Sequence, residues 1–143
     1  MRAVLDTNVL VSLLLKSGGV GAWLLSSWAE GRYEVVISQA IFEELLEILD
    51  RPHIAPRIRS DRRLALLSRL RGRAIWTLGT LNIAGATPDS DDDMLVSAAM
   101  EGGATYIVTW DKALLNFGQY QDTRFVTPQE FIALLNQSAS PTA

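Results

Sequence analysis

The sequence predicts an α/β fold of three layers, in which a central parallel sheet of about five strands is flanked by helices. Short apolar runs rich in valine and isoleucine alternate along the chain with longer segments of helical periodicity. Two of these runs end at an aspartate, Asp6 and Asp111. Strands that alternate with helices imply right-handed crossovers, and these place helices on both faces of a parallel sheet.

The composition is that of one globular domain, for which we expect residues 1–136, followed by a disordered tail over 137–143. The 143 residues are 48% hydrophobic and 20% charged. The chain has no cysteine and one histidine, His53, which excludes disulfides, thiolate metal sites and histidine-rich metal sites within one chain. Any bound metal would therefore have oxygen ligands, which favours magnesium, manganese or calcium.

We expect the protein to be cytoplasmic. Asp6 and Asn8 interrupt the first apolar run, which is not the pattern of a signal peptide. No apolar run approaches the length that spans a bilayer, so we expect no membrane association.

The first half of the chain shows clear element boundaries. We expect a strand ending at Asp6, helices over 9–16 and 20–30, a strand over 33–37 and a helix over 39–50. Ser38 suits the N-cap of the last of these helices, and Arg51-Pro52 ends it. Trp28 has the helical spacing of a core residue.

The second half continues the alternation. We expect a helix over 61–70, a short strand over 74–78, an irregular loop over 79–88, a helix from Asp89 or Ser90 to 101, a strand over 105–109, a short helix or turn over 113–117, a strand over 124–126 and a final helix. Asp61 can cap the first of these helices, with Leu64, Leu67 and Leu70 on one side, and Gly72 stops it. Thr127-Pro128-Gln129-Glu130 is a capping box with proline at the first helical position.

Asp6 and Asp111 are expected at the same edge of the sheet, because each follows a parallel strand directly. Either aspartate alone could simply cap the helix that follows it. The repetition at two strand ends favours a shared crevice.

Helical periodicity selects two further acids. In the helix over 39–50, Glu44 lies on the apolar stripe whereas Glu43 lies on a polar face, so we expect Glu44 to point inward. Among Asp91, Asp92 and Asp93, it is Asp92 that shares the apolar stripe, so we place Asp92 in the crevice. A helix start with several charges is the competing interpretation, and Asp89 and Asp91 suit caps.

Four converging carboxylates would repel one another, which costs several kcal/mol or raises their pKa values. Lys112 is the nearest candidate for neutralising them. A hard divalent cation solves the problem, since carboxylates and water satisfy its coordination. Such an ion can clamp a phosphate and lower the pKa of a bound water, as phosphodiester hydrolysis requires.

These motifs resemble the PIN-domain ribonuclease family, and within it the toxin components of bacterial toxin–antitoxin systems (VapC-like). The resemblance covers residues 2 to about 135 and rests on Asp6-Thr7-Asn8, Glu44-Leu45, the Asp-x-Asp-Asp helix start at 89–92, and Ile107-Val108-Thr109-Trp110-Asp111. It implies an endoribonuclease dependent on Mg²⁺ or Mn²⁺, with catalytic and metal-binding acids at Asp6, Glu44, Asp92 and Asp111. It also suggests supporting roles for Asn8 and Thr109, beside the capping Asp89. Trp110 departs from the family, which usually has glycine or a small or basic residue there, and this bears on access to the site.

A basic stripe suggests where RNA would bind. Eight arginines and one acid lie between Arg51 and Arg73, a local charge of +7, whereas the rest of the chain carries −10. We expect phosphate contacts from Arg57, Arg59, Arg62 and Arg63. A solvated helix face is the alternative interpretation. The resemblance adds two partners, a cognate antitoxin that could use the same groove and a second copy of the chain, with Trp28, Trp76 or Trp110 as candidate contacts.

The same acids are compatible with two other functions. One is a phosphoacceptor or phosphatase domain, in which an aspartate is attacked covalently beside magnesium. Asn8 at the third position of Asp-x-Asp counts against the phosphatase, and Lys112 directly after Asp111 is a poor match to a receiver domain. The other is a catalytically silent PIN domain that binds RNA or a partner.

Overall fold

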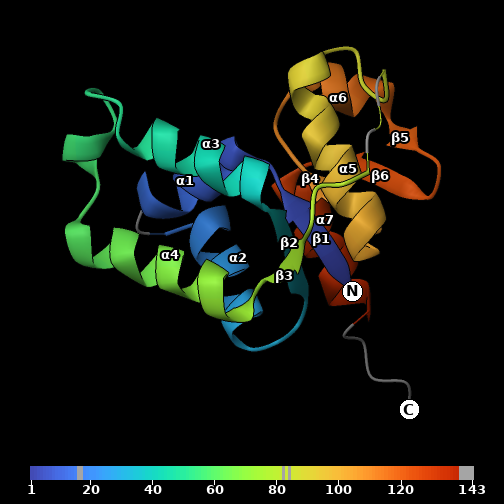
Figure 1. The fold of residues 1–143 in the computed structure, drawn as a ribbon. Coiled ribbons are helices and arrows are strands. Elements are labelled where there is room, and N and C mark those ends of the chain that lie inside the picture. The colour runs from blue at the N-terminus through green and yellow to red at the C-terminus, as the bar shows by residue number, and fades with distance from the viewer. Residues whose placement is uncertain (16–17, 82, 84, 139–143) are drawn as a thin grey trace.

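The central element is a six-stranded sheet with the strand order β3-β2-β1-β4-β6-β5 (Figure 1). The computed structural model describes residues 1–15, 18–81, 83 and 85–138. The strands are β1 (Arg2–Leu5), β2 (Glu34–Ser38), β3 (Ile75–Thr77), β4 (Tyr106–Val108), β5 (Gln119–Tyr120) and β6 (Thr123–Val126). The first five strands in this order, β3, β2, β1, β4 and β6, are parallel, as the sequence predicts. The sheet is therefore mostly parallel. β5 pairs antiparallel to β6 in a hairpin too short to leave a periodic signal.

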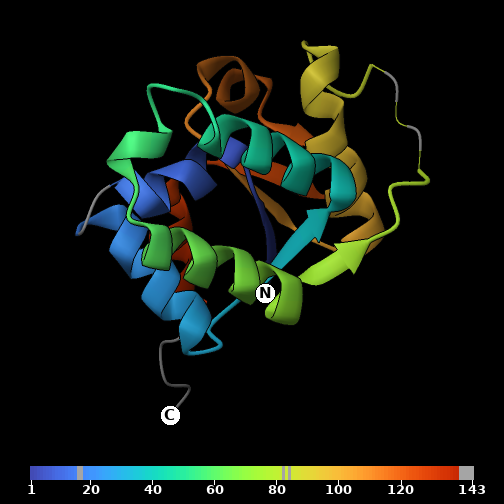
Figure 2. The same ribbon diagram turned by 60° about the vertical axis from the view of Figure 1, so that its left-hand side comes forward.

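Helices cover both faces of this sheet. They are α1 (Thr7–Leu15), α2 (Val20–Ala29), α3 (Gln39–Leu49), α4 (Ser60–Arg73), α5 (Asp93–Gly102), α6 (Lys112–Phe117) and α7 (Pro128–Ser138), with short 3-10 turns η1 (Ala55–Arg57) and η2 (Ser90–Asp92). α5 packs on one face, and α7 packs on the other beside α2 (Figures 1 and 2). Within the described residues no single helix is long and apolar enough to cross a membrane, although α1 and α2 pass that test as a bent pair.

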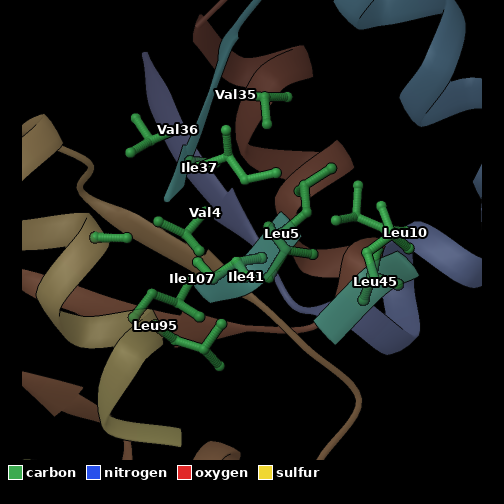
Figure 3. Close-up of a cluster of buried hydrophobic side chains, with 14 of the residues drawn as sticks. Val4, Leu5, Leu10, Val35, Val36, Ile37, Ile41, Leu45, Leu95 and Ile107 are labelled. Atoms are coloured by element: carbon green, nitrogen blue, oxygen red, sulfur yellow. The ribbon is translucent and has the colours of Figure 1, made fainter. Parts of the chain in front are cut away.

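The arrangement of the core explains why the strand sequences are continuous apolar runs. Val4 is in register with Val36 and Ile107. Figure 3 shows these side chains on the side of α5, near Leu95. Leu5, the next residue along β1, points to the opposite face, and every one of these side chains is 1% exposed or less. Both faces of β1 are therefore buried, as is typical of a parallel sheet.

Several predicted boundaries are corrected. α1 begins at Thr7 rather than at residue 9, because the Asp6 carbonyl already accepts the first helical N–H groups. α7 runs through Ser138, so two residues of the predicted tail are helical. Residues 139–143, like the predicted helix end at residue 16, lie outside the described residues. Trp28 is 2% exposed and belongs to the core, which removes it as a surface contact.

α4 differs most from its prediction. It begins at Ser60 and continues through Gly72, so Gly72 does not stop it. Asp61 lies in its first turn and pairs with Arg59 instead of capping. The buried stripe consists of Leu66, Leu67 and Leu70, whereas Leu64 is 63% exposed. The periodicity was compatible with either stripe, and packing against β2 decided between them.

The strand order positions the functional site. From β1 the chain builds outward through β2 and β3, and then returns to the other side of β1 to add β4 and β6. The switch point of this topology therefore lies between β1 and β4. Open α/β sheets form their ligand crevices at the carboxyl ends of the strands at such a point. Asp6 follows β1 there, and Thr109 to Asp111 follow β4.

Two glycines test the close packing of α5 against the sheet. A Cβ on Gly102 would lie 2.4 Å from Cγ1 of Val36, whereas a Cβ on Gly72 would meet no atom within 4 Å. Gly102→Ala should lower the free energy of unfolding by about 1–3 kcal/mol through overpacking. The matched control, Gly72→Ala, should raise it by about 0.5–1 kcal/mol because alanine is the better helix former. Urea unfolding measures both, and a stabilised Gly102→Ala variant would contradict the described contact.

Candidate active site

Asp6 is a buried carboxylate held at the end of β1. Its main-chain N–H donates to the Val108 carbonyl, which continues the pairing of β1 with β4 by one residue. That register places Asp6 beside Thr109, whose hydroxyl donates to Oδ2 of Asp6 at 2.7 Å. Asp6 is only 7% exposed. Burial raises the pKa of its carboxyl, and the hydrogen bonds from Thr109 and Thr7 counteract part of that rise.

Thr7 joins Asp6 to Glu44. The Thr7 hydroxyl lies 2.9 Å from Oε2 of Glu44 and 3.4 Å from Oδ1 of Asp6, so its single proton is donated mainly to Glu44. Glu44 is half-buried and Glu43 is exposed, as the periodicity predicts. Sequence reasoning missed the role of Thr7. Its signal was its position, directly after the strand-end aspartate at the start of α1.

Asp111 is both a helix cap and a member of the acidic cluster. Its Oδ1 accepts from the main-chain N–H groups of Ala113 and Leu114 at 2.8 and 3.2 Å, so the capping interpretation is correct. Its own N–H donates to the Thr109 hydroxyl at 3.0 Å. The negative charge of Asp111 nevertheless raises the pKa of Asp6. Capping and membership of the cluster therefore coexist.

The negative charges of all the other predicted acids act on Asp92. It is half-buried at the end of η2, directly before α5. Burial, followed by the negative charges of Asp6, Asp111, Asp89 and Glu44, raises the pKa of Asp92 to about 6. The four predicted acids therefore share one electrostatic field at the switch point, and we refer to Asp6, Glu44, Asp92 and Asp111 as the acidic cluster.

The neighbours of Asp92 have structural roles. Asp93 accepts from the N–H groups of Gly85 and Thr87 and from the Thr87 hydroxyl, and so organises the preceding loop. Asp89 accepts from the N–H of Asp91 at 3.0 Å and caps η2, as predicted, while its charge also acts on Asp92. Asn8 is exposed on α1, and no described hydrogen bond joins it to the acidic cluster.

A family model described as a PIN domain matches residues 2–113 of this chain. The chain belongs to the PIN-domain family. Members of this family are typically metal-dependent nucleases, and all four residues of the acidic cluster lie within the matched segment. A comparison with curated proteins found no significant match.

The acidic cluster of this PIN domain fits a hard cation by the chemistry of its donors, which are all carboxylate oxygens. The charges of three other acids and of Asp89 act on Asp92, and the described residues show no ion pair that neutralises any member of the cluster. Within the described part of the chain, no three acidic or histidine side chains are close enough to hold one ion directly. Magnesium keeps several waters and needs only one or two protein carboxylates, so contacts through water suit this arrangement.

The basic stripe of the PIN domain is partly engaged in the fold. Arg59 pairs with Asp61, and Arg63 pairs with Asp50, each at 2.8 Å. Arg63 also donates to the Leu49 carbonyl, and Arg62 donates to the Leu13 carbonyl at 3.2 Å. Arg57 is exposed in η1. Charge patterning located the stripe but could not show which of its arginines support the fold.

The burial of Asp92 and, after it, repulsion within the acidic cluster predict a pH effect on stability. The folded pKa of Asp92, about 6, exceeds the ordinary value of 3.8, so its ionised form is disfavoured in the folded state. Asp92→Asn should therefore raise the melting temperature at pH 8, and this gain should shrink as the pH falls through 6 towards 4. Thermal unfolding without divalent ions measures this, with the exposed Asp91→Asn as control. A destabilised Asp92→Asn variant at pH 8 would contradict the raised pKa of Asp92.

Proposed function

We propose that this PIN domain is a divalent-metal-dependent endoribonuclease that hydrolyses RNA phosphodiester bonds, and that it is the toxin of a toxin–antitoxin pair. The observation that carries the nuclease proposal is the meeting of acids at the switch point of the sheet, where Thr7 links Asp6 to Glu44 and Thr109 links Asp6 to Asp111. Mg²⁺ or Mn²⁺ is the proposed cofactor, because only oxygen donors are present in the cluster.

The side chains of the cluster would have different roles. Asp6, Asp92 and Asp111 would hold the metal, at least one of them through a bridging water. A bound divalent ion would polarise the scissile phosphate and lower the pKa of water. Glu44 would orient the attacking water and accept its proton, and the Thr7 hydroxyl would hold Glu44 in place. Thr109 restricts the rotation of the Asp6 carboxylate through its 2.7 Å hydrogen bond.

The position of Asp6 disfavours the phosphoacceptor alternative. A covalent mechanism needs one carboxylate oxygen exposed to an incoming phosphate. Asp6 is 7% exposed, and each of its oxygens has a threonine hydroxyl beside it. These contacts suit a fixed ligand better than a nucleophile.

RNA would be held by the exposed part of the basic stripe, with Arg57 as the main phosphate contact and Arg59 beside it.

An antitoxin segment would use a groove of about 350 Å³ between α2 and α4, lined by Leu25, Leu66, Arg62 and Arg69. An amphipathic acidic segment matches this combination of leucine and arginine. A second copy of the chain remains a further proposed partner, with Trp76 and Trp110 exposed on the surface.

Asp6→Asn tests the nuclease. The variant keeps its hydrogen-bonding shape but loses a charge that the metal needs, so Mn²⁺-dependent cleavage of RNA should fall about a hundredfold or more. Added Mn²⁺ should raise the melting temperature of the wild type and have a smaller effect on the variant. Cleavage is compared with a chelator control.

Full activity of pure Asp6→Asn would remove Asp6 from the mechanism. Bound RNA without cleavage by the wild type would indicate a silent binding domain, and acyl-phosphate formed from a small phosphodonor would indicate the phosphoacceptor. The same variant tests the toxin role: induced wild type should arrest bacterial growth, and Asp6→Asn should not.

Arg57→Ala tests the phosphate contact with little risk to the fold. It should weaken RNA binding by a similar factor for different sequences and reduce the slope of log K against log salt by about 1. Arg124→Ala is the matched control, because Arg124 is an exposed arginine on β6, outside the basic stripe. An unchanged salt slope for Arg57→Ala would show that this arginine is only solvated.

A further inference from the structure

A second cavity lies beside Trp110, the residue between Thr109 and Asp111 in the sequence, and has no role in the chemistry described above. Its volume is about 360 Å³, within the usual range of small-molecule pockets. It lies between α1, the start of α2 and the start of α7, and its lining includes Ser12, Gly18, Gly19, Gly21, Trp110 and Gln129. None of the described lining residues carries a charge. We refer to this cavity as the Trp110 pocket.

The strand end connects the Trp110 pocket to the acidic cluster. Thr109 donates to Asp6, and Asp111 donates its N–H to Thr109, so the residues on both sides of Trp110 are anchored at the cluster. The Trp110 side chain reaches the start of α7, where its Nε1 donates to Oε1 of Gln129 at 3.4 Å.

The Trp110 ring is exposed to solvent rather than buried. It is 40% exposed, in contrast to Trp28 in the core. A glycine turn forms part of the lining, and a Cβ on Gly18 or Gly19 would meet no atom within 4 Å. Gly19 also has a φ of +75°, which disfavours any side chain there.

The chemistry of these walls selects a ligand class. A flat aromatic face beside hydroxyl and amide groups suits a neutral planar heterocycle with polar edges. Bases of single-stranded RNA stack on exposed aromatic side chains in this way.

We propose that the Trp110 pocket binds one unpaired base of the RNA, next to the phosphate that lies over the acidic cluster. Trp110 stacks on the base. Gln129, whose Oε1 accepts from Trp110, presents its amide nitrogen to an acceptor on the base edge. This inference rests on the proposed RNA substrate but is independent of cleavage, because it concerns binding alone.

The test measures binding in the Asp6→Asn background, so that no RNA is cleaved. The probes are a labelled single-stranded RNA of random sequence and an abasic oligomer of equal length, which has the same charge without bases. Trp110→Leu keeps apolar bulk but removes the aromatic face, and Trp110→Phe keeps a smaller face. Trp76→Leu is the positional control, since Trp76 is 36% exposed on the distant edge strand β3.

Trp110→Leu should raise the Kd for the random RNA about tenfold or more, and Trp110→Phe should raise it less. Neither variant should change the Kd for the abasic oligomer, and Trp76→Leu should change neither Kd. Equal binding by the Leu and Phe variants, or an equal loss on the abasic oligomer, would overturn the base-binding role.

Different results would overturn the endonuclease proposal and the base-pocket proposal. If the wild-type chain does not cleave RNA with Mn²⁺ but the Leu variant still loses base-dependent binding, the endonuclease is wrong and the base pocket stands. If cleavage is observed and the Trp110 variants bind like the parent, the endonuclease stands and the base pocket is wrong.

Discussion

The structure depends on keeping a buried negative charge at the end of the central strand. Asp6 follows β1 without a break, and its main chain both extends the sheet and starts α1. The side chain is therefore carried into a site where burial raises its pKa. The Thr109 hydroxyl donates to the carboxylate and, together with weaker hydrogen bonds from Thr7, offsets part of that cost. The charge of Asp111 adds to the rise in the pKa of Asp6, and the charges of Asp6, Asp111 and Glu44 add to the rise in the pKa of Asp92.

Structural and chemical roles overlap at this edge of the sheet. Asp111 caps α6 with one oxygen while its charge acts on Asp6 and Asp92. Asp89 caps η2 and acts on Asp92 in the same way. A cap places a carboxylate at a helix start, and in this fold the helix starts meet at the carboxyl edge of the parallel strands. The geometry that caps the helices therefore also concentrates the charge.

In the basic stripe, by contrast, many of the charged side chains support the fold. Its arginines are numerous in the sequence, yet Arg63 supports the C-terminal end of α3 through Leu49 and Asp50, and Arg62 reaches the end of α1. Two others, Arg69 and Arg71, lie over the rings of Trp28 and Phe42. Much of the stripe thus ties α4 to the helices around it, which leaves few side chains for an anionic partner.

The sequence by itself determined the alternation of strands and helices, the two acids at strand ends and the inward direction of Glu44. These features follow from the local periods of strand and helix, which the backbone imposes whatever the tertiary contacts are. Only the tertiary structure decided the β5 hairpin, the exposed Leu64, the bridge from Thr7 to Glu44, the engaged arginines and the pocket beside Trp110. Each of these depends on which residues meet across long sequence separations, and no local period encodes that choice.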